Sequence, residues 1–379
     1  EMVSGACVFS GQPFHCAVAS NRGDSLEWYA EMLEKGGAAS SSNDHCKSNP
    51  DAIDIGSLVD YPRRHCGQNP VSVPECFDDV GFIKKSRVFL FRGAHDTVSK
   101  PGAVENVDAL LAQLITDPAK SIKREISTLA FGHEVPLKTT PFVGSTVAAG
   151  YDGPGECLRH VFDMMPGELK SGNASQTDWH MFDQAEFAGD KAVGFQTSGW
   201  VFVPERCHNF NNQGPGSAPC KLLVRPGKCT GVAPMDVAPD VIEFANYAQA
   251  NGIVLLAPCL GGPVDKSAFP HASDIEKGKL DVYGQLDKNY VQQSAPHMRA
   301  IGKMIRRVLG AAQPQPIQSP PPPPPSSRFN CSVLPTTCLR NTPPAGWKAC
   351  CGCKGTGAFG SLWMARSGSC PGACMAAPQ

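Results

Sequence analysis

The sequence has no excess of charge of either sign and no long apolar run. It holds 34 Lys and Arg against 35 Asp and Glu, which argues against nucleic acid or an anionic membrane as the main partner. No run of about 18 apolar residues occurs, so no membrane span is expected. A signal peptide is also missing, but the chain starts with Glu1 instead of Met. We therefore expect a processed product or a fragment, and the missing signal does not indicate the cytosol.

Cysteine, by contrast, is abundant. Of 17 cysteines, ten lie between Cys7 and Cys259 and seven between Cys331 and Cys374. This density favours disulfides and an oxidising compartment, and the odd total leaves one thiol unpaired or paired outside the chain. Two N-glycosylation tripeptides, at Asn173 and Asn330, suit a secreted protein, although such tripeptides also arise by chance. We expect an extracellular protein.

Composition divides the chain into three parts. Residues 1–310 form the main domain, which ends in an amphipathic basic helix predicted over His297–Leu309. In that helix Met298, Ile301, Ile305 and Val308 have the spacing of a stripe that packs on a sheet. Residues 311–327 form a linker whose unbroken run Pro320–Pro325 predicts an extended polyproline II spacer.

Residues 328–379 form a small Cys-rich module without Asp, Glu or His. Few apolar residues remain to build a core, so we expect disulfides to hold it together. Zinc binding by Cys350–Cys353 is a weaker alternative, because the segment offers no His ligand. Three aromatic residues of the module are candidates either to grip an insoluble polymer or to fill its own core, and these are Trp347, Phe359 and Trp363.

Strands and helices alternate in the main domain, which predicts an α/β fold with a mostly parallel sheet and helices on both faces. The expected strands are Arg87–Phe91, Arg124–Phe131, Leu222–Arg225 and Ile253–Ala257. The expected helices are Val104–Leu114, Asp152–Phe162 and Pro239–Ala250, the last with proline in its first turn.

Two loops have the pattern of a catalytic site. Each follows an apolar run, breaks at a Gly and presents a titratable side chain, Asp96 in Arg87–Val98 and His133 in Ala130–Pro136. Loops at the carboxyl ends of parallel strands converge on one edge of a sheet, so the two side chains can meet there. An Asx turn or helix cap at Asp96 and a solvated loop histidine at His133 are the structural alternatives, and His95 is a rival base.

An acid followed by a histidine, each after a strand, is the later part of a serine-hydrolase triad. His133 is the candidate base and Asp96 the candidate orienting acid. The expected nucleophile, a serine in a G-x-S-x-G turn, occurs nowhere in the 379 residues.

Ordered matches over Ser4–Leu309 are similar to the secreted polyhydroxybutyrate depolymerase family of serine esterases. Leu90–Val98 is similar to the acid loop of the family and Gly132–Pro136 to its histidine loop, so the resemblance implies the same roles for Asp96 and His133. The remaining matches are Val3–Ala17, Gly150–Glu156, Phe182–Phe187, Thr197–Pro204 with Cys207, Tyr247–Val254 and Asp281–Gly284.

The resemblance implies a circularly permuted α/β-hydrolase fold that uses no cofactor and no metal. It places the oxyanion strand and turn on Leu222–Cys229, with Cys229 as the residue whose amide holds the oxyanion. It also places the nucleophile upstream of the position that matches Glu1.

Two departures lie inside the chain. The oxyanion turn reads Pro226-Gly-Lys-Cys229, which loses the histidine of the family, and Lys279-Leu-Asp-Val-Tyr-Gly284 replaces a segment with Cys and Trp near the family's cleft. Leu137 also stands where the family has Thr.

Three functions follow as hypotheses. The first is a serine ester hydrolase of the depolymerase type, acting on a polyester or other ester, with the Cys-rich module as a polymer-adsorption surface. The second is a non-catalytic secreted relative that binds polymer or cell wall. The third is a feruloyl-type or small-ester carboxylesterase.

Overall fold

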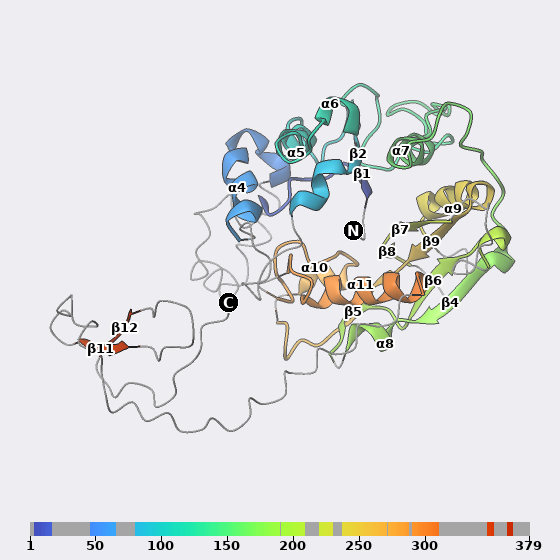
Figure 1. The fold of residues 1–379 in the computed structure, drawn as a ribbon. Coiled ribbons are helices and arrows are strands. Elements are labelled where there is room, and N and C mark those ends of the chain that lie inside the picture. Colours follow the sequence, from blue (N-terminus) through green and yellow to red (C-terminus); the bar gives the residue numbers. More distant parts are fainter. Residues whose placement is uncertain are drawn as a thin grey trace. The chain divides into compact units, whose positions relative to one another are not determined.

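The structure is a computed structural model that describes residues 4–16, 46–65, 80–189, 191–208, 220–229, 237–270, 272–287, 290–310, 347–351 and 362–366 (Figure 1). The chain divides into two compact units, Glu1–Gln313 and Pro314–Gln379. In the second unit, β11 (Trp347–Cys351) pairs antiparallel with β12 (Leu362–Arg366). The side chains of this module, including its aromatic residues and the zinc candidate, lie outside the described residues.

The first sheet of the larger unit is parallel and has the order β1-β2-β3. Its strands are β1 (Gly5–Phe9), β2 (Arg87–Arg92) and β3 (Ile122–Ile126). The alternation of β2 sends Val88 and Leu90 against α5 (Ala103–Ala112), whereas Phe89 and Phe91 face the side of α7 (Gly153–Val161). Helices therefore cover both faces of this sheet, as the sequence predicts.

The other strands form a four-stranded sheet, order β4-β6-β9-β7, and a three-stranded sheet, order β5-β10-β8. They are β4 (Trp179–Asp183), β5 (Val193–Phe195), β6 (Ser198–Phe202), β7 (Lys221–Val224), β8 (Gly227–Lys228), β9 (Ile253–Ala257) and β10 (Cys259–Val264).

The expectation of a mostly parallel sheet is wrong for this half of the unit. Strand β6 is antiparallel to both neighbours, and β5 is antiparallel to β10. Only β7 with β9 and β8 with β10 are parallel. The physical reason is that the direction of a strand is set by its pairing partners. The partner β9 lies far from β6 along the chain, so the local apolar pattern does not specify the direction of β6.

The remaining helices complete the layers. They are α4 (Ile55–His65), α6 (Pro118–Ser121), α8 (Ala185–Ala188), α9 (Pro239–Asn251), α10 (Ser273–Glu276) and α11 (Pro296–Val308). Short 3-10 turns lie at Pro50–Ala52, Val80–Lys85, Gln176–Asp178 and Glu205–Cys207. No helix in the described part of the chain is long and apolar enough to span a membrane.

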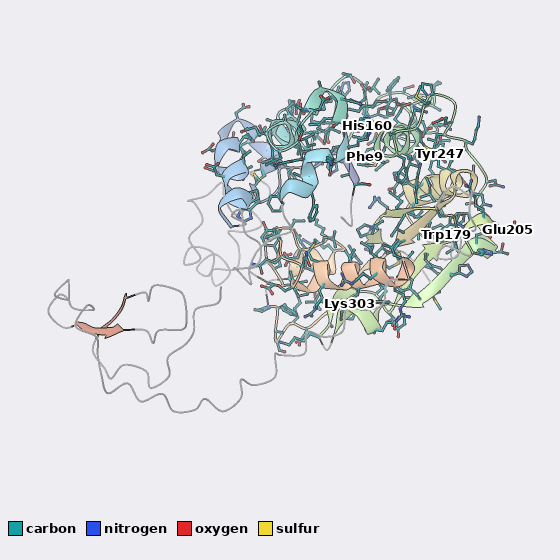
Figure 2. The ribbon with its side chains drawn as sticks, viewed as in Figure 1. Phe9, His160, Trp179, Glu205, Tyr247 and Lys303 are labelled. Atoms are coloured by element: carbon teal, nitrogen blue, oxygen red, sulfur yellow. A yellow bond between two sulfur atoms is a disulfide. The ribbon has the colours of Figure 1, made fainter. Side chains whose placement is uncertain are left out.

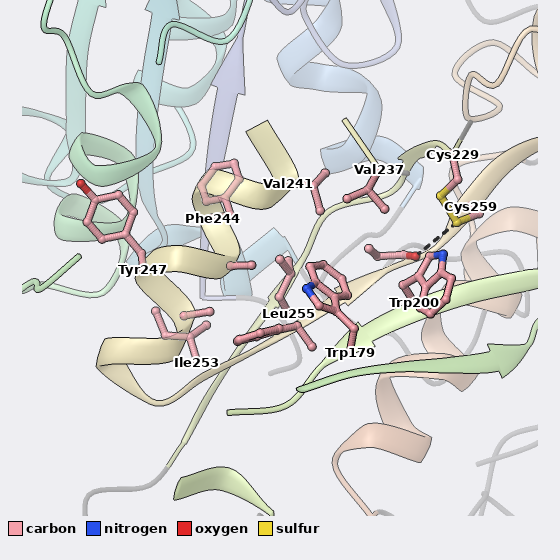
Figure 3. Close-up of a cluster of buried hydrophobic side chains, with 14 of the residues drawn as sticks. Trp179, Trp200, Cys229, Val237, Val241, Phe244, Tyr247, Ile253, Leu255 and Cys259 are labelled. Atoms are coloured by element: carbon pink, nitrogen blue, oxygen red, sulfur yellow. Dashed lines mark hydrogen bonds between the residues drawn. A yellow bond between two sulfur atoms is a disulfide. The ribbon is translucent and has the colours of Figure 1, made fainter. Parts of the chain in front are cut away.

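The main core lies between α9 and the four-stranded sheet (Figure 3). Trp179 and Trp200 pack there with Phe244 and Leu255, and each is at most 5% exposed. Burial of each such side chain contributes about 1.5–3 kcal/mol, so this cluster fixes α9 on the sheet. Tyr247 of α9 belongs to this core and Phe9 of β1 packs against it, and Figure 2 labels both residues.

Four disulfides join described cysteines. They link Cys7 to Cys157, Cys16 to Cys46, Cys207 to Cys220 and Cys229 to Cys259. The bond from Cys7 to Cys157 ties β1 to α7, so the first sheet is cross-linked to the helix that covers it. Cys66 and Cys76 lie outside the described residues.

Two boundaries differ from the sequence-based prediction. Strand β3 ends at Ile126 rather than at Phe131, because Ser127 adopts a positive φ of 60° that breaks the extended backbone. In α11 the predicted apolar stripe is confirmed for Ile301, Ile305 and Val308, which pack against the core, but not for Met298, which is 50% exposed. The buried face also includes His297, Ala300 and Met304.

His297 can face the core because both of its ring nitrogens have partners. Nδ1 accepts from the amide of Asp281 at 2.9 Å, and Nε2 donates to the carbonyl of Val193 at 2.7 Å. The ring is therefore neutral. Burial lowers the pKa of His297 below its usual 6.5, and this outweighs the opposing effects of the Val193 carbonyl and the Asp281 carboxylate.

This burial predicts a loss of stability in weak acid. The folded pKa of His297 is lowered, so below about pH 6.5 the unfolded chain binds a proton that the folded chain does not. The stabilisation is present above pH 6.5 and falls by up to about 1.4 kcal/mol per pH unit below it. Urea unfolding between pH 7.5 and 5 should show a smaller slope with pH in the His297→Gln variant. Replacing the exposed His180 by Gln is the control and should leave the slope unchanged.

Candidate active site

Asp96 lies in the loop that follows β2, and its side chain is completely buried. Oδ1 accepts hydrogen bonds from the amides of Val98 at 2.9 Å and Ser99 at 2.8 Å. This is the Asx turn that the sequence left open as the structural alternative. The turn does not compete with a catalytic role, because it fixes the carboxylate in one orientation and leaves Oδ2 directed at His133.

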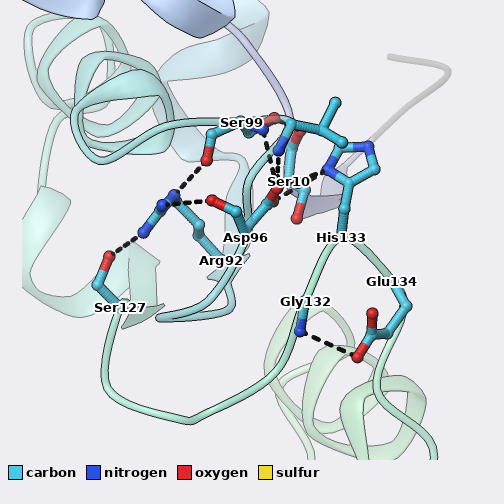
Figure 4. Close-up of polar contacts among 9 residues, drawn as sticks. Ser10, Arg92, Asp96, Ser99, Ser127, Gly132, His133 and Glu134 are labelled. Carbon is cyan, nitrogen blue, oxygen red and sulfur yellow. Dashed lines mark hydrogen bonds and ion pairs between the residues drawn. The ribbon is translucent and has the colours of Figure 1, made fainter. Parts of the chain in front are cut away.

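His133 lies in the loop after β3, and the structure brings it directly to Asp96 (Figure 4). Nδ1 is 2.9 Å from Oδ2 and 3.1 Å from Oδ1 of Asp96. The histidine side chain is 40% exposed, whereas the carboxylate is not exposed at all. No hydrogen bond to Nε2 is formed within the described residues. A ring held by a carboxylate at Nδ1, with Nε2 open, is the arrangement of a general base and its orienting acid.

The surroundings of Asp96 keep it ionised. Burial by itself raises the pKa of Asp96, but the nearby Ser10 side chain and the hydrogen bonds from the Ser99 amide and the His133 ring outweigh it. The pKa of Asp96 is therefore lowered from its usual 3.8, and the carboxylate is charged at neutral pH. A charged carboxylate stabilises the imidazolium that forms when His133 takes up a proton.

Gly93 explains how the two loops approach so closely. The amide of Ala94 donates to the carbonyl of Leu129 at 2.7 Å, and the amide of His95 donates to the carbonyl of Phe131 at 3.0 Å. A Cβ at Gly93 would lie 2.0 Å from the carbonyl oxygen of Phe131. The glycine that breaks the apolar run is thus required by contact between the two backbones.

The other predicted site residues behave differently. His95, the rival base, is exposed and bonds the opposite loop through its amide, as expected of a solvated neighbour. Cys229 lies on a different sheet, after β8, where its sulfur is bonded to Cys259. No hydrogen bond of the described residues links Cys229 to Asp96 or His133.

The sequence reasoning missed Arg92. It is the last residue of β2, is 1% exposed, and donates hydrogen bonds to the loop that carries Asp96. The signal that could have found it is a charged residue within an apolar run immediately before the Gly. No group of three or more His, Cys, Asp or Glu in the described ranges could hold a metal ion.

Comparisons with known proteins give relatives of one kind. Poly(3-hydroxybutyrate) depolymerase of Delftia acidovorans is 25% identical over 333 residues, covering 83% of this chain and 57% of the relative. The chain is a homologue of the poly(3-hydroxybutyrate) depolymerases. The chain spans a little over half the length of this curated relative. The relative also confirms the resemblance read from the sequence. No protein-family model matches the chain.

Solved structures add the fold. The PHB depolymerase of Penicillium funiculosum has a TM-score of 0.55 at 17% identity, over 82% of this chain and 88% of that one. A PHB depolymerase with a serine-to-alanine substitution, in complex with an R3HB trimer, has a TM-score of 0.54 at 18% identity over the same shares. The fold is of the α/β-hydrolase type.

Gly93 provides a test of the site geometry. Gly93→Ala should force the two loops apart and cost about 1–3 kcal/mol of stability, as overpacking does. The Nδ1-bound proton of His133, followed by NMR with labelled histidine, should lose its hydrogen-bonded signal. Gly227→Ala, where the nearest atom to the added Cβ is 3.5 Å away, is the control and should retain that signal. A normal signal in Gly93→Ala would contradict the close-approach explanation.

Proposed function

We propose that this chain carries the acid and the base of an ester hydrolase of the poly(3-hydroxybutyrate) depolymerase type. The observation that carries the proposal is the 2.9 Å bond between His133 Nδ1 and the buried Asp96 carboxylate. It is formed by the two loops that resemble the acid and histidine loops of that family. Homology to a curated depolymerase supports the same assignment.

The chemistry is acyl transfer in two steps. In the first step, Nε2 of His133 accepts the proton of a serine hydroxyl while the serine oxygen attacks the ester carbonyl. Asp96 stabilises the imidazolium, which then donates its proton to the leaving alcohol as the carbon–oxygen bond breaks. In the second step, water attacks the acyl-serine by the same proton path, and the acid is released. The 379 residues contain no elbow serine for this reaction.

The strand order supports a circularly permuted α/β-hydrolase sheet. Strands β7 and β1 each end a sheet within the described part of the chain. One strand placed between them would join the four-stranded sheet β4-β6-β9-β7 and the three-stranded sheet β1-β2-β3 into a single sheet of eight strands. The family resemblance places the nucleophile strand beside the oxyanion strand, here β7, which is the same position.

Cys229 is the proposed oxyanion residue, acting through its backbone amide. Two contacts support a fixed turn at this position. The disulfide ties Cys229 to Cys259, and the Gln196 side chain donates to the Cys229 carbonyl at 2.9 Å. A fixed peptide is what electrostatic stabilisation of an oxyanion needs, because the donor then costs no reorganisation during the reaction.

Secretion and polymer adsorption complete the proposal. Four disulfides within the larger unit suit an oxidising compartment, and Asn173 of the first glycosylation tripeptide is exposed. The Cys-rich module, residues 328–379, is proposed as the surface that adsorbs to polymer. The proline-rich linker, residues 311–327, would separate it from the hydrolase domain.

A non-catalytic relative is the second candidate. Its support is the turn Pro226-Gly-Lys-Cys229, which lacks the histidine of the family, together with the missing elbow serine. Such a protein would keep the fold and bind polymer without turnover.

The test compares two polypeptides on poly(3-hydroxybutyrate) film and on a short-chain nitrophenyl ester. The polypeptide Glu1–Gln379 should show no turnover that a serine reagent blocks. A form that also carries a strand and an elbow serine should hydrolyse both substrates. Serine-reagent-sensitive activity in Glu1–Gln379 would require a different nucleophile and overturn this assignment.

The base assignment has a matched control in the same loop pair. In the form that carries the serine, His133→Ala should lower kcat by about 10²–10⁴-fold, the usual contribution of a general base. His95→Ala removes an exposed histidine next to Asp96 and should leave turnover unchanged. Equal losses in both variants would show that His133 is not the base.

A further inference from the structure

Arg92 is a charged residue in an unusual environment. It is the largest fully buried side chain of the described residues, and it is the last residue of an otherwise apolar strand. None of the ion pairs of the described residues involves it. Buried guanidinium groups are costly unless hydrogen bonds satisfy them, so its partners indicate what it does.

Those partners are three oxygens around the Asp96 loop. Nε donates to the carbonyl of Ser99 at 2.6 Å, and Nη2 donates to the carbonyl of Asp96 at 3.1 Å. Nη1 donates to the hydroxyl of Ser127 at 2.6 Å. Ser127 follows β3, the strand that leads to His133, and its amide returns a bond of 2.8 Å to the Arg92 carbonyl. The guanidinium therefore contacts the start of both catalytic loops (Figure 4).

Ser99 connects this guanidinium to the carboxylate. Its carbonyl accepts from Arg92, and its amide donates to Oδ1 of Asp96 at 2.8 Å. Its hydroxyl donates to the carbonyl of Ser10 at 2.8 Å, which holds the turn against the end of β1. A shift of Ser99 would therefore move a donor directly away from the Asp96 carboxylate.

We propose that Arg92 is a positioning residue that holds the Asp96 carboxylate against Nδ1 of His133. It acts through the backbone of the turn Asp96–Ser99 and does not touch the reacting atoms. Arginine suits this role because its planar group directs donors at three separate acceptors, whereas the ammonium of lysine is a single compact donor on a flexible stem. This inference rests on the proposed function, in which Asp96 orients the base.

The experiment measures the Nδ1-bound proton of His133 by NMR in the chain Glu1–Gln379 with labelled histidine, so it does not need a nucleophile. Asp96→Asn defines the signal when the carboxylate is lost. Arg92→Lys should move the signal towards that of Asp96→Asn and speed exchange of the proton with water by about tenfold, the effect of weakening one hydrogen bond.

Arg87→Lys is the control for loss of stability alone. Arg87 begins the same strand and pairs with Asp163 at 2.5 Å, far along β2 from the dyad. The Arg87→Lys variant should lower the midpoint of unfolding and leave the NMR signal of the His133 Nδ1 proton unchanged. Ser127→Ala removes only one of the three acceptors, so it keeps the test available should Arg92→Lys fail to fold. It should give a smaller shift in the same direction.

The proposal is overturned if Arg92→Lys, or Ser127→Ala where the lysine variant does not fold, retains the wild-type signal while Asp96→Asn loses it. Failure of the proposed function has a different signature. A form that carries the elbow serine would then show no ester hydrolysis, while the NMR response to Arg92→Lys would be unaffected.

Discussion

The hydrogen bond between the Asp96 carboxylate and Nδ1 of His133 is the interaction on which the candidate site depends. The carboxylate is buried and charged, so it is stable there only with donors on its oxygens. Two amides of its own turn and the histidine ring supply them. The histidine remains partly exposed, which leaves its other nitrogen available for chemistry.

This bond depends on the contact between two backbones. Strands β2 and β3 are parallel neighbours, so their following loops emerge at the same edge. Gly93 lets these loops touch, and Arg92 binds oxygens at the beginning of each. The sheet itself is held from both faces by α5 and α7, and the disulfide from Cys7 to Cys157 adds a covalent tie. Precision at the dyad thus comes from packing as well as from polar contacts.

The sequence predicted the dyad because strand, glycine and titratable residue follow one another twice in the chain. It could not predict the exact end of β3, since the positive φ of Ser127 is not signalled by its residue type. It also missed His297 as part of the buried face of α11, because a histidine with two backbone partners counts as polar in any periodicity. Arg92 was missed because a charged residue also counts as polar, and its partners lie in two loops, the turn Asp96–Ser99 and the start of the loop after β3, that only the fold brings together. The directions of β5 and β6 depend on long-range pairing that local patterns do not contain.

The candidate acid and base, Asp96 and His133, follow strands of one sheet, whereas the proposed oxyanion residue, Cys229, follows a strand of another. The acid–base pair can therefore form, and be held by Arg92, whether or not a nucleophile and an oxyanion turn stand opposite it. An active esterase and a binding protein of this fold would share the same Asp96–His133 geometry. In the proposed permuted fold, the strand placed between β7 and β1 would distinguish them, because it would bring the serine to Nε2 and the two halves of the site to one edge.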